Sequence, residues 1–356
     1  MIIKETKGAL DNFNVEYKDF KYDFGLGGIH GCISSGVYTS NNEENIESAD
    51  VASYYPNIAI KNGIYPKHLS KEFCNVYQRI FEERRSSPKS SAKNKGLKLA
   101  LNGVYGKSND KYSFLYDPEY TMKTTINGQL LLCMLAERMQ DAGFKMLMIN
   151  TDGLECIVPK KDKHIYDSIC QQWQNETKFE LEFDTYKKLI IRDVNNYIGQ
   201  FENGSLKHKG CFVYENLELH KNPSMKVVAF ALEKYFVNNI PVKETIENHN
   251  DIYDFCCRFK ATKGWIPHLF ALLNDNINNE DIEFFSACQK TNRYYVSNKG
   301  YEFYKIHEDN RKIGIQKDWK IQLFNQFFKK DTIKEYDINY QFYIEECNKI
   351  INAIEN

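Results

Sequence analysis

The sequence predicts an α+β fold, because helical and strand patterns occupy different stretches of the chain. Apolar residues at helical spacing predict a helical hairpin within 61–107, with its break at Ser86-Ser87-Pro88. A third helix is expected over 126–142. Two short apolar runs around Asp152-Gly153 predict a tight β-hairpin over 145–158. We expect residues 1–49 to be rich in loops and residues 213–356 to be mostly helical.

Composition indicates an ordinary folded chain. The 356 residues are 42% hydrophobic and 27% charged, which excludes a disordered protein. Ten cysteines occur without a C-x-x-C pair, which argues against a zinc cluster or a disulfide framework. The formal net charge of −1 gives by itself no indication of a nucleic-acid partner.

The distribution of charge is more informative than its total. Residues 41–60 contain four acidic residues and no lysine or arginine. Residues 79–107 contain eight lysines and arginines against two glutamates. An acidic segment followed by a basic one suggests a metal-binding part beside a phosphate-binding part, although a solvated basic helical hairpin is the simpler alternative.

Three ordered segments have a common explanation. They are Asp50-Val51-Ala52-Ser53-Tyr54-Tyr55-Pro56, then Lys98 to Gly106 (KLALNGVYG), then Asn150-Thr151-Asp152-Gly153. In this order they resemble motifs A (D-x-x-S-L-Y-P), B (K-x-x-x-N-S-x-Y-G) and C (D-T-D-S/G) of family B DNA polymerases, most of all bacteriophage-type members. The resemblance extends from about Gly25 to Gly300, so it implies the polymerase domain.

The resemblance implies a metal-dependent nucleotidyl transfer. A primer 3′-hydroxyl attacks the α-phosphate of a nucleotide, and two Mg²⁺ ions stabilise the attacking and leaving oxygens. Asp50 and Asp152 match the carboxylates that bridge the metals, and the Val51 carbonyl matches a backbone ligand. Such oxygen ligands suit Mg²⁺, with Mn²⁺ as the expected substitute. Taken singly, each aspartate has a simpler interpretation, as a cap or as part of a turn.

The resemblance also implies a nucleotide site. Tyr55 matches the tyrosine that packs under the sugar and excludes a 2′-hydroxyl, so deoxynucleotides are the expected substrates. Ser53 and Tyr54 match positions whose backbone amides meet the triphosphate. Lys98 is expected to contact the triphosphate and to offset charge on the leaving pyrophosphate. The other expected nucleotide-binding residues are Arg84, in whose place Arg85 is an alternative, Lys89, Asn102 and Tyr105.

Contacts with DNA are expected before and after these motifs. Gly27-Gly28 resembles a Tyr-x-Gly-Gly turn near the template strand. Thr151 is also expected to contact DNA. Residues that match the primer-gripping segment after motif C are Asn196, Tyr197, Lys207, Lys209 and Gly210. Further phosphate contacts are suggested at His220, Lys221, Asn222, Lys260, Arg293, Tyr294 and Tyr295, with ordinary surface charge as the alternative.

Several positions depart from the family pattern. Asn150 replaces a frequent aspartate, Gly103 replaces a serine, and Asn195 replaces a lysine. Only 49 residues precede Asp50, and they contain no D-x-E exonuclease motif, so we expect no proofreading within this chain. The short spacings between the motifs also suggest that strand displacement is not built in.

The resemblance therefore implies a right-hand polymerase. The expected regions are 1–60 as the N-terminal part of the palm with motif A, 61–107 as helical-hairpin fingers with motif B, 108–212 as the antiparallel palm with motif C, and 213–356 as a mostly helical thumb and C-terminal region. Expected partners are primer–template DNA, dNTPs and a separate exonuclease, clamp or helicase, without a membrane. The expected location is the cytoplasm, that of a bacterial host if a phage encodes the chain.

Two other functions compete with this interpretation. The first is a weakly active or inactive DNA-binding subunit of a split polymerase, which Asn150 and the missing exonuclease favour. The second is an RNA-making or RNA-copying palm polymerase. A reverse transcriptase would show Tyr-x-Asp-Asp in place of 150–153, and an RNA-making enzyme would not be expected to have Tyr55.

Overall fold

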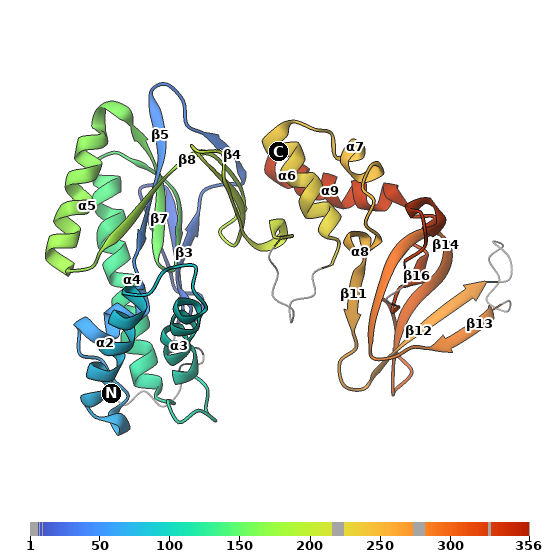
Figure 1. Cartoon of the computed structure of the whole chain (residues 1–356), viewed down its shortest axis with the longest axis horizontal. Coiled ribbons are helices and arrows are strands. Elements are labelled where there is room, and N and C mark those ends of the chain that lie inside the picture. Colours follow the sequence, from blue (N-terminus) through green and yellow to red (C-terminus); the bar gives the residue numbers. More distant parts are fainter. Residues whose placement is uncertain are drawn as a thin grey trace. The chain divides into compact units, whose positions relative to one another are not determined.

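The computed structural model describes residues 6, 8, 10–215, 224–272, 282–326 and 329–355. His220, Lys221 and Asn222, suggested above as phosphate contacts, lie outside the described residues. The chain divides into two compact units. The first comprises Met1–Val194 and Gly199–Lys207, and the second comprises Asn195–Ile198 and His208–Asn356. Each is described by itself (Figure 1).

The N-terminal part of the chain combines a large sheet with five helices in its described residues. The helices are α1 (Tyr54–Lys61), α2 (Glu72–Arg85), α3 (Ala92–Ser108), α4 (Pro118–Asp141) and α5 (Lys163–Thr177). The strands are β1 (Asn14–Tyr17), β2 (Phe20–Gly25), β3 (Gly28–Cys32), β4 (Gly36–Thr39), β5 (Glu44–Val51), β6 (Lys145–Asn150), β7 (Gly153–Pro159), β8 (Leu181–Asp193), β9 (Asn196–Phe201) and β10 (Leu206–His208).

The sheet order brings distant segments together at its centre. The order is β1-β2-β3-β6-β7-β5-β8-β9-β10, with β4 also paired to β8. Strand β5 lies antiparallel to both β7 and β8, so Asp50 is directly opposite Gly153 on one side and Glu182 on the other. The expected antiparallel sheet is therefore present, and its central strands contain the first and third motifs.

Alternation along these strands separates a core face from an open face. Ala49 and Val51 of β5 and Leu154 and Cys156 of β7 point into the main hydrophobic core. Helices α1, α4 and α5 supply large side chains such as Trp173 to this core. Figure 1 shows α4 and α5 along one side of the sheet. Residues at the intervening positions, which include Asp50, therefore face away from this core.

Local sequence patterns predicted their elements well. The expected helical hairpin is confirmed by α2 and α3, which pack together around Tyr77 and Leu101. The expected β-hairpin is confirmed by β6 and β7. Helix α4 starts earlier than predicted, at Pro118, because Asp117 caps its first turn by accepting from the amides of Glu119 and Tyr120. No helix in the described part of the chain is both long and apolar enough to cross a membrane.

The expectation of a loop-rich region before Asp50 is wrong. This region forms strands β1 to β5. Strands β1, β2 and β3 pair in succession, but the other partners come from far along the chain: β3 also pairs with β6, β4 with β8, and β5 with β7 and β8. Pairs between strands so distant in sequence have no local turn signal, and propensity alone did not reveal these strands.

The expectation of a mostly helical region over 213–356 is also wrong. Its described helices are α6 (Lys226–Asn238), α7 (Val242–Glu247), α8 (Ile252–Phe255) and α9 (Tyr340–Glu355). The described strands are β11 (Cys257–Lys260), β12 (Trp265–Leu272), β13 (Ile282–Ala287), β14 (Thr291–His307), β15 (Lys312–Gly314) and β16 (Ile321–Leu323). They form a sheet in the order β11-β14-β12-β13, with β15 and β16 also paired to β14 (Figure 1).

Candidate active site

Asp50 and Asp152 are brought together by the pairing of β5 with the β6–β7 hairpin. The amide of Val51 donates to the carbonyl of Asp152 at 2.7 Å, so the ends of the two motifs are in direct backbone contact. The Asp50 side chain is about one third exposed, at 34%. Two aspartates that are 102 positions apart in the sequence therefore lie on neighbouring backbone at the ends of central strands of one sheet.

The tight turn that presents Asp152 consists of Thr151 and Asp152. Thr151 adopts a left-handed φ of 60°, which is uncommon for a threonine. Its amide donates to the carbonyl of Ile29 at 2.9 Å, which ties the turn to β3. Gly153 is not one of the positive-φ residues and is already paired in β7. The sequence signal identified the hairpin correctly, but the glycine is not needed for its turn.

Lys207 lies next to Asp50. Its Nζ is 3.7 Å from Asp50 Oδ2, and it donates to the Tyr186 hydroxyl at 3.2 Å. Burial raises the pKa of the Asp50 carboxyl above its usual 3.8, whereas the positive charge of Lys207 acts in the opposite direction. The residue expected to contact the primer is therefore also a counter-charge for one of the two motif aspartates.

Sequence reasoning missed an acidic stripe on β8 and the segment just before it. Glu180, Glu182 and Asp184 alternate with apolar or partly buried neighbours and are all exposed. Asp184 and Glu182 both raise the pKa of Asp50 by like-charge repulsion. The i, i+2, i+4 spacing of these acids was the signal that could have identified them, since it places all three on one face of a strand.

Two cations of the helical hairpin face this stripe. Arg85 pairs with Glu180 at 3.0 Å, and Lys89 lies 3.5 Å from Glu182. All four side chains are largely exposed, so each pair contributes less than about 1 kcal/mol to stability. Weak exposed pairs of this kind separate at little cost when a more highly charged ligand competes for the cation.

Tyr55 joins three predicted segments. Its ring stacks on that of Tyr105 with centroids 4.2 Å apart and an interplanar angle of 7°. Its hydroxyl donates to the carbonyl of Gly27 at 2.8 Å, and the Tyr105 hydroxyl donates to that of Leu26 at 2.7 Å. A Cβ on Gly28, whose φ is +133°, would lie 3.0 Å from the Tyr55 hydroxyl. The Gly-Gly turn, motif A and motif B therefore meet at one place.

Helix α1 begins at the motif A tyrosines. The amides of Tyr54 and Tyr55 lie in its first turn, where backbone N–H groups have no intrahelical acceptor. The Tyr54 side chain is buried and its hydroxyl donates to the Gly128 carbonyl at 2.6 Å, so only its backbone is available to a ligand. Arg84 donates to the Ser53 hydroxyl at 2.8 Å. An arginine and helix-start amides that lack an intrahelical acceptor thus lie together, an arrangement that suits an anion.

Lys98 and Asn102 project from α3 and are both exposed. Neither side chain makes a hydrogen bond or an ion pair with any residue that the structure describes. Tyr105 lies on the same face of the helix, as the spacing predicts. Because Tyr105 contacts Tyr55 directly, this face of α3 is the one turned toward motif A.

Comparison with known proteins adds a distant sequence relationship. No family model matches the chain. A DNA polymerase from Archaeoglobus fulgidus is 25% identical over 228 residues, which cover 54% of this chain and 29% of the relative. DNA polymerase 1 from Pyrococcus abyssi is 24% identical over 151 residues, 33% of this chain and 20% of the relative. The chain is similar to DNA polymerases. It spans less than a third of the length of these relatives.

Among solved structures, the family B DNA polymerase of the hyperthermophilic archaeon Pyrobaculum calidifontis matches over 96% of this chain and 47% of that one. The TM-score is 0.45 and the sequence identity is 15%.

The residues expected to grip a primer are divided between the two units. Lys207 belongs to the first, while Asn196, Tyr197, Lys209 and Gly210 belong to the second. The Asn196 side chain accepts from the amide of Cys211 at 2.8 Å, and the Lys209 amide donates to the Tyr197 carbonyl at 3.0 Å. The Tyr197 side chain is buried, so the sequence-based assignment of that side chain to DNA has no support from its exposure.

The donor atoms at the candidate site suit a hard cation. Asp50 and Asp152 provide carboxylate oxygens. Burial is the main cause of the raised pKa of Asp50, with a smaller contribution from the negative charges of Asp184 and Glu182. Among the described residues no three histidine, cysteine or acidic side chains group as a metal cluster. A Mg²⁺ ion uses few protein carboxylates and completes its shell with water and phosphate oxygens, so two aspartates fit it.

Proposed function

We propose that the chain contains the polymerase domain of a family B DNA polymerase. It would catalyse template-directed transfer of dNMP from a dNTP to a primer 3′-hydroxyl. A bond forms between the primer 3′ oxygen and the α-phosphorus, and the bond to pyrophosphate breaks. The observation that best supports this is the backbone contact of Val51 with Asp152, because it joins the two expected metal-binding aspartates across separate strands.

Asp50 and Asp152 would hold the two Mg²⁺ ions, with the Val51 carbonyl as a further ligand. When bound, the ions would stabilise the attacking and leaving oxygens. The amides at the start of α1 and the side chains of Arg84 and Lys98 would bind the triphosphate. The amides have no intrahelical acceptor, Arg84 reaches motif A through its hydrogen bond to Ser53, and Lys98 makes no hydrogen bond or ion pair with a described residue.

Tyr55 would exclude ribonucleotides. Its ring is fixed on one side by stacking on Tyr105 and at its hydroxyl by the Gly27 carbonyl. A side chain held at both ends yields little to a 2′-hydroxyl, so steric exclusion by this ring is a reasonable basis for deoxynucleotide selection.

Primer extension tests the proposal. The full chain is incubated with a labelled primer–template, Mg²⁺ and dNTPs or NTPs, and Asp152→Ala is compared with Asp162→Ala. We expect extension with dNTPs, a loss of at least ~10³-fold in Asp152→Ala, and no change in Asp162→Ala. Extension that survives Asp152→Ala would exclude the mechanism.

An inactive wild type that still binds primer–template would favour the DNA-binding subunit of a split polymerase. One observation bears on that alternative. The Asn150 side chain donates to the Val194 carbonyl at 2.9 Å, so it has a structural role that an aspartate could not fill. A phage setting, a separate exonuclease and the lack of proofreading stay predictions.

A further inference from the structure

The first unit contains a small pocket between the β1–β2 hairpin and helix α4. Its volume is about 200 Å³, below the roughly 300–1,000 Å³ of sites that enclose drug-sized ligands. The described residues that line it are Val15, Tyr17, Tyr22, Phe24, Cys133, Glu137 and Gln140. None of them belongs to the candidate active site. A pocket of this size suits a small molecule or a single side chain.

Two neighbouring strands give the pocket its aromatic walls. Val15 of β1 lies directly opposite Tyr22 of β2, and Phe24 follows Tyr22 by two positions, so their side chains share one face of the hairpin. Tyr17, two positions after Val15, lies on the same face. Three aromatic rings therefore border the pocket, and the faces of such rings carry partial negative charge.

Hydrogen bonds hold the two tyrosine rings in place. The Tyr17 hydroxyl donates to Asp141 Oδ1 at 2.6 Å, and the Tyr22 hydroxyl donates to Gln140 Oε1. The side-chain amide of Gln140 in turn donates to the Tyr17 carbonyl at 2.9 Å. The rings are therefore fixed before a ligand arrives, which reduces the entropy lost on binding.

Glu137 is the charged residue among those that line the pocket. It lies on one face of α4 with Cys133 and Gln140, at i, i+4 and i+7. Its side chain is exposed and makes no hydrogen bond or ion pair with any residue that the structure describes. Burial raises the pKa of Tyr22 and Cys133, and the negative charge of Glu137 adds to both shifts. The carboxylate therefore acts on the same space as these two uncharged side chains.

The cations next to this pocket have other partners. The Lys18 ammonium donates to Asp141 Oδ1 at 2.5 Å. Arg138, the neighbour of Glu137 on α4, pairs with Glu176 at 2.6 Å. Within the described part of the chain, the negative charge of Glu137 is therefore left without a partner.

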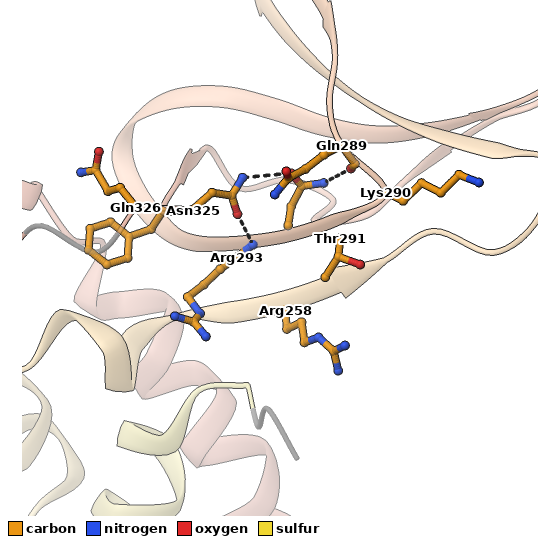
Figure 2. A pocket seen from close by; sticks show the side chains of 9 residues that line it. Arg258, Gln289, Lys290, Thr291, Arg293, Asn325 and Gln326 are labelled. Atoms are coloured by element: carbon orange, nitrogen blue, oxygen red, sulfur yellow. Dashed lines mark hydrogen bonds between the residues drawn. The ribbon is translucent and has the colours of Figure 1, made fainter. Parts of the chain in front are cut away.

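A cavity of the second unit has the opposite character. Figure 2 shows Arg258, Lys290 and Arg293 among its lining residues, and it lies with the phosphate contact that the sequence suggested at Arg293. The pocket beside α4 has aromatic rings and a carboxylate in place of cations. It is therefore suited to a positively charged ligand and unsuited to an anion.

We propose that the pocket between the β1–β2 hairpin and α4 binds an alkylammonium group. Aromatic faces attract such a cation, and the Glu137 carboxylate adds a direct charge pair. The apolar side chains of Val15 and Cys133 suit the methyl or methylene groups around the nitrogen. A free amine and a lysine side chain of a partner protein are two sources of this same chemistry.

Binding to the full chain is measured by calorimetry with two pairs of probes, without nucleotide or Mg²⁺, so the outcome is independent of the proposed polymerase activity. Choline represents a free amine, and its tert-butyl analogue has the same shape without the charge. A glycine-flanked lysine peptide represents the side chain of a partner, and the same peptide with norleucine is its uncharged counterpart.

The variants separate charge from ring. Glu137→Gln removes the charge and breaks no hydrogen bond or ion pair with a described residue, so it should fold normally. Tyr17→Leu removes a ring, whereas Tyr17→Phe keeps the ring and loses only the hydroxyl. Glu16→Gln is the control, because Glu16 is an exposed glutamate on the opposite face of β1.

We expect choline or the lysine peptide to bind at least about fivefold more tightly than its uncharged counterpart. Glu137→Gln and Tyr17→Leu should each weaken that binding at least about threefold, while Tyr17→Phe and Glu16→Gln should not. Binding of choline alone identifies a free amine as the source, and tighter binding of the peptide identifies a side chain of a partner. Equal affinities within each pair of probes, unchanged affinity in Glu137→Gln, or absence of binding by the wild type overturns the proposal.

Discussion

The carboxylate of Asp50 occupies the space that a side chain on residue 153 would need. A Cβ added to Gly153 would come within 1.7 Å of Asp50 Oδ1. Asp50 and Gly153 are directly opposite in the β5–β7 ladder, so the two positions are linked by register. The glycine of the third motif therefore allows the aspartate of the first motif to lie over the strand that follows Asp152.

Gly153→Ala should displace the Asp50 carboxylate. We expect a loss of about 10²-fold in primer extension, because a displacement of about 1 Å at a reacting centre costs that much. Stability should fall by about 1–3 kcal/mol through overpacking. Gly96→Ala is the control, since a Cβ there meets nothing within 4 Å and its helical position should gain up to about 1 kcal/mol. Full activity in Gly153→Ala would show that the carboxylate position is not critical.

Tyr55→Ala and Tyr55→Phe should distinguish the contribution of the Tyr55 ring to sugar selectivity from that of its hydroxyl. The alanine variant removes the ring that stacks on Tyr105, so the preference for dNTPs over NTPs should fall at least about tenfold, or about 1.4 kcal/mol. The phenylalanine variant loses only the hydrogen bond to Gly27 and should keep most of the preference. The measurement is the ratio of kcat/KM for the two sugars. An unchanged ratio in Tyr55→Ala would remove Tyr55 from this role.

These residues also mark how far the sequence could be interpreted. The hairpins 72–108 and 145–159 were predictable, because their signals are local: helical stripes in one and a turn dipeptide in the other. The closeness of Asp50 and Asp152 followed from motif order by resemblance. The position of the acids on β8 could not be predicted in this way, because only the β5–β8 register places Glu182 beside Asp50.

The C-terminal unit was predicted least well. Strand β14 spans Thr291–His307 and pairs with four other strands, all through contacts that depend on the fold of the whole unit. The assignment of Arg293 to phosphate stays a prediction, whereas its neighbours Tyr294 and Tyr295 are buried in the core. Consecutive aromatic residues gave no sequence signal for which of their side chains face solvent.

Asp50→Asn should stabilise the first unit at neutral pH. Burial raises the pKa of the Asp50 carboxyl above 3.8, so folding favours its protonated form and ionisation costs stability as the pH rises. The asparagine should therefore be more stable above the folded pKa and show no advantage below 3.8. Because the carboxyl is 34% exposed, the gain should not exceed about 1 kcal/mol.

The measurement is urea unfolding of the full chain from below pH 3.8 to neutral pH, with Asp162→Asn as the control. A stability difference that is independent of pH would mean that ionisation of Asp50 is not its source. Polymerase activity should be lost in Asp50→Asn at every pH, since an amide is a poorer Mg²⁺ ligand than a carboxylate.

Lys98→Ala should impair nucleotide use without affecting stability. The Lys98 side chain is exposed and makes no hydrogen bond or ion pair with a described residue, so its removal should change the free energy of unfolding by less than about 0.5 kcal/mol. If Lys98 binds the triphosphate, kcat/KM for dNTP incorporation should fall by about 10²-fold, as for other single donors to developing charge. Lys107→Ala is the matched control, because Lys107 lies two and a half turns further along α3, on the opposite side of the helix. Equal losses in the two variants would indicate a general effect of positive charge on DNA binding, and an unchanged kcat/KM in Lys98→Ala would exclude the triphosphate contact.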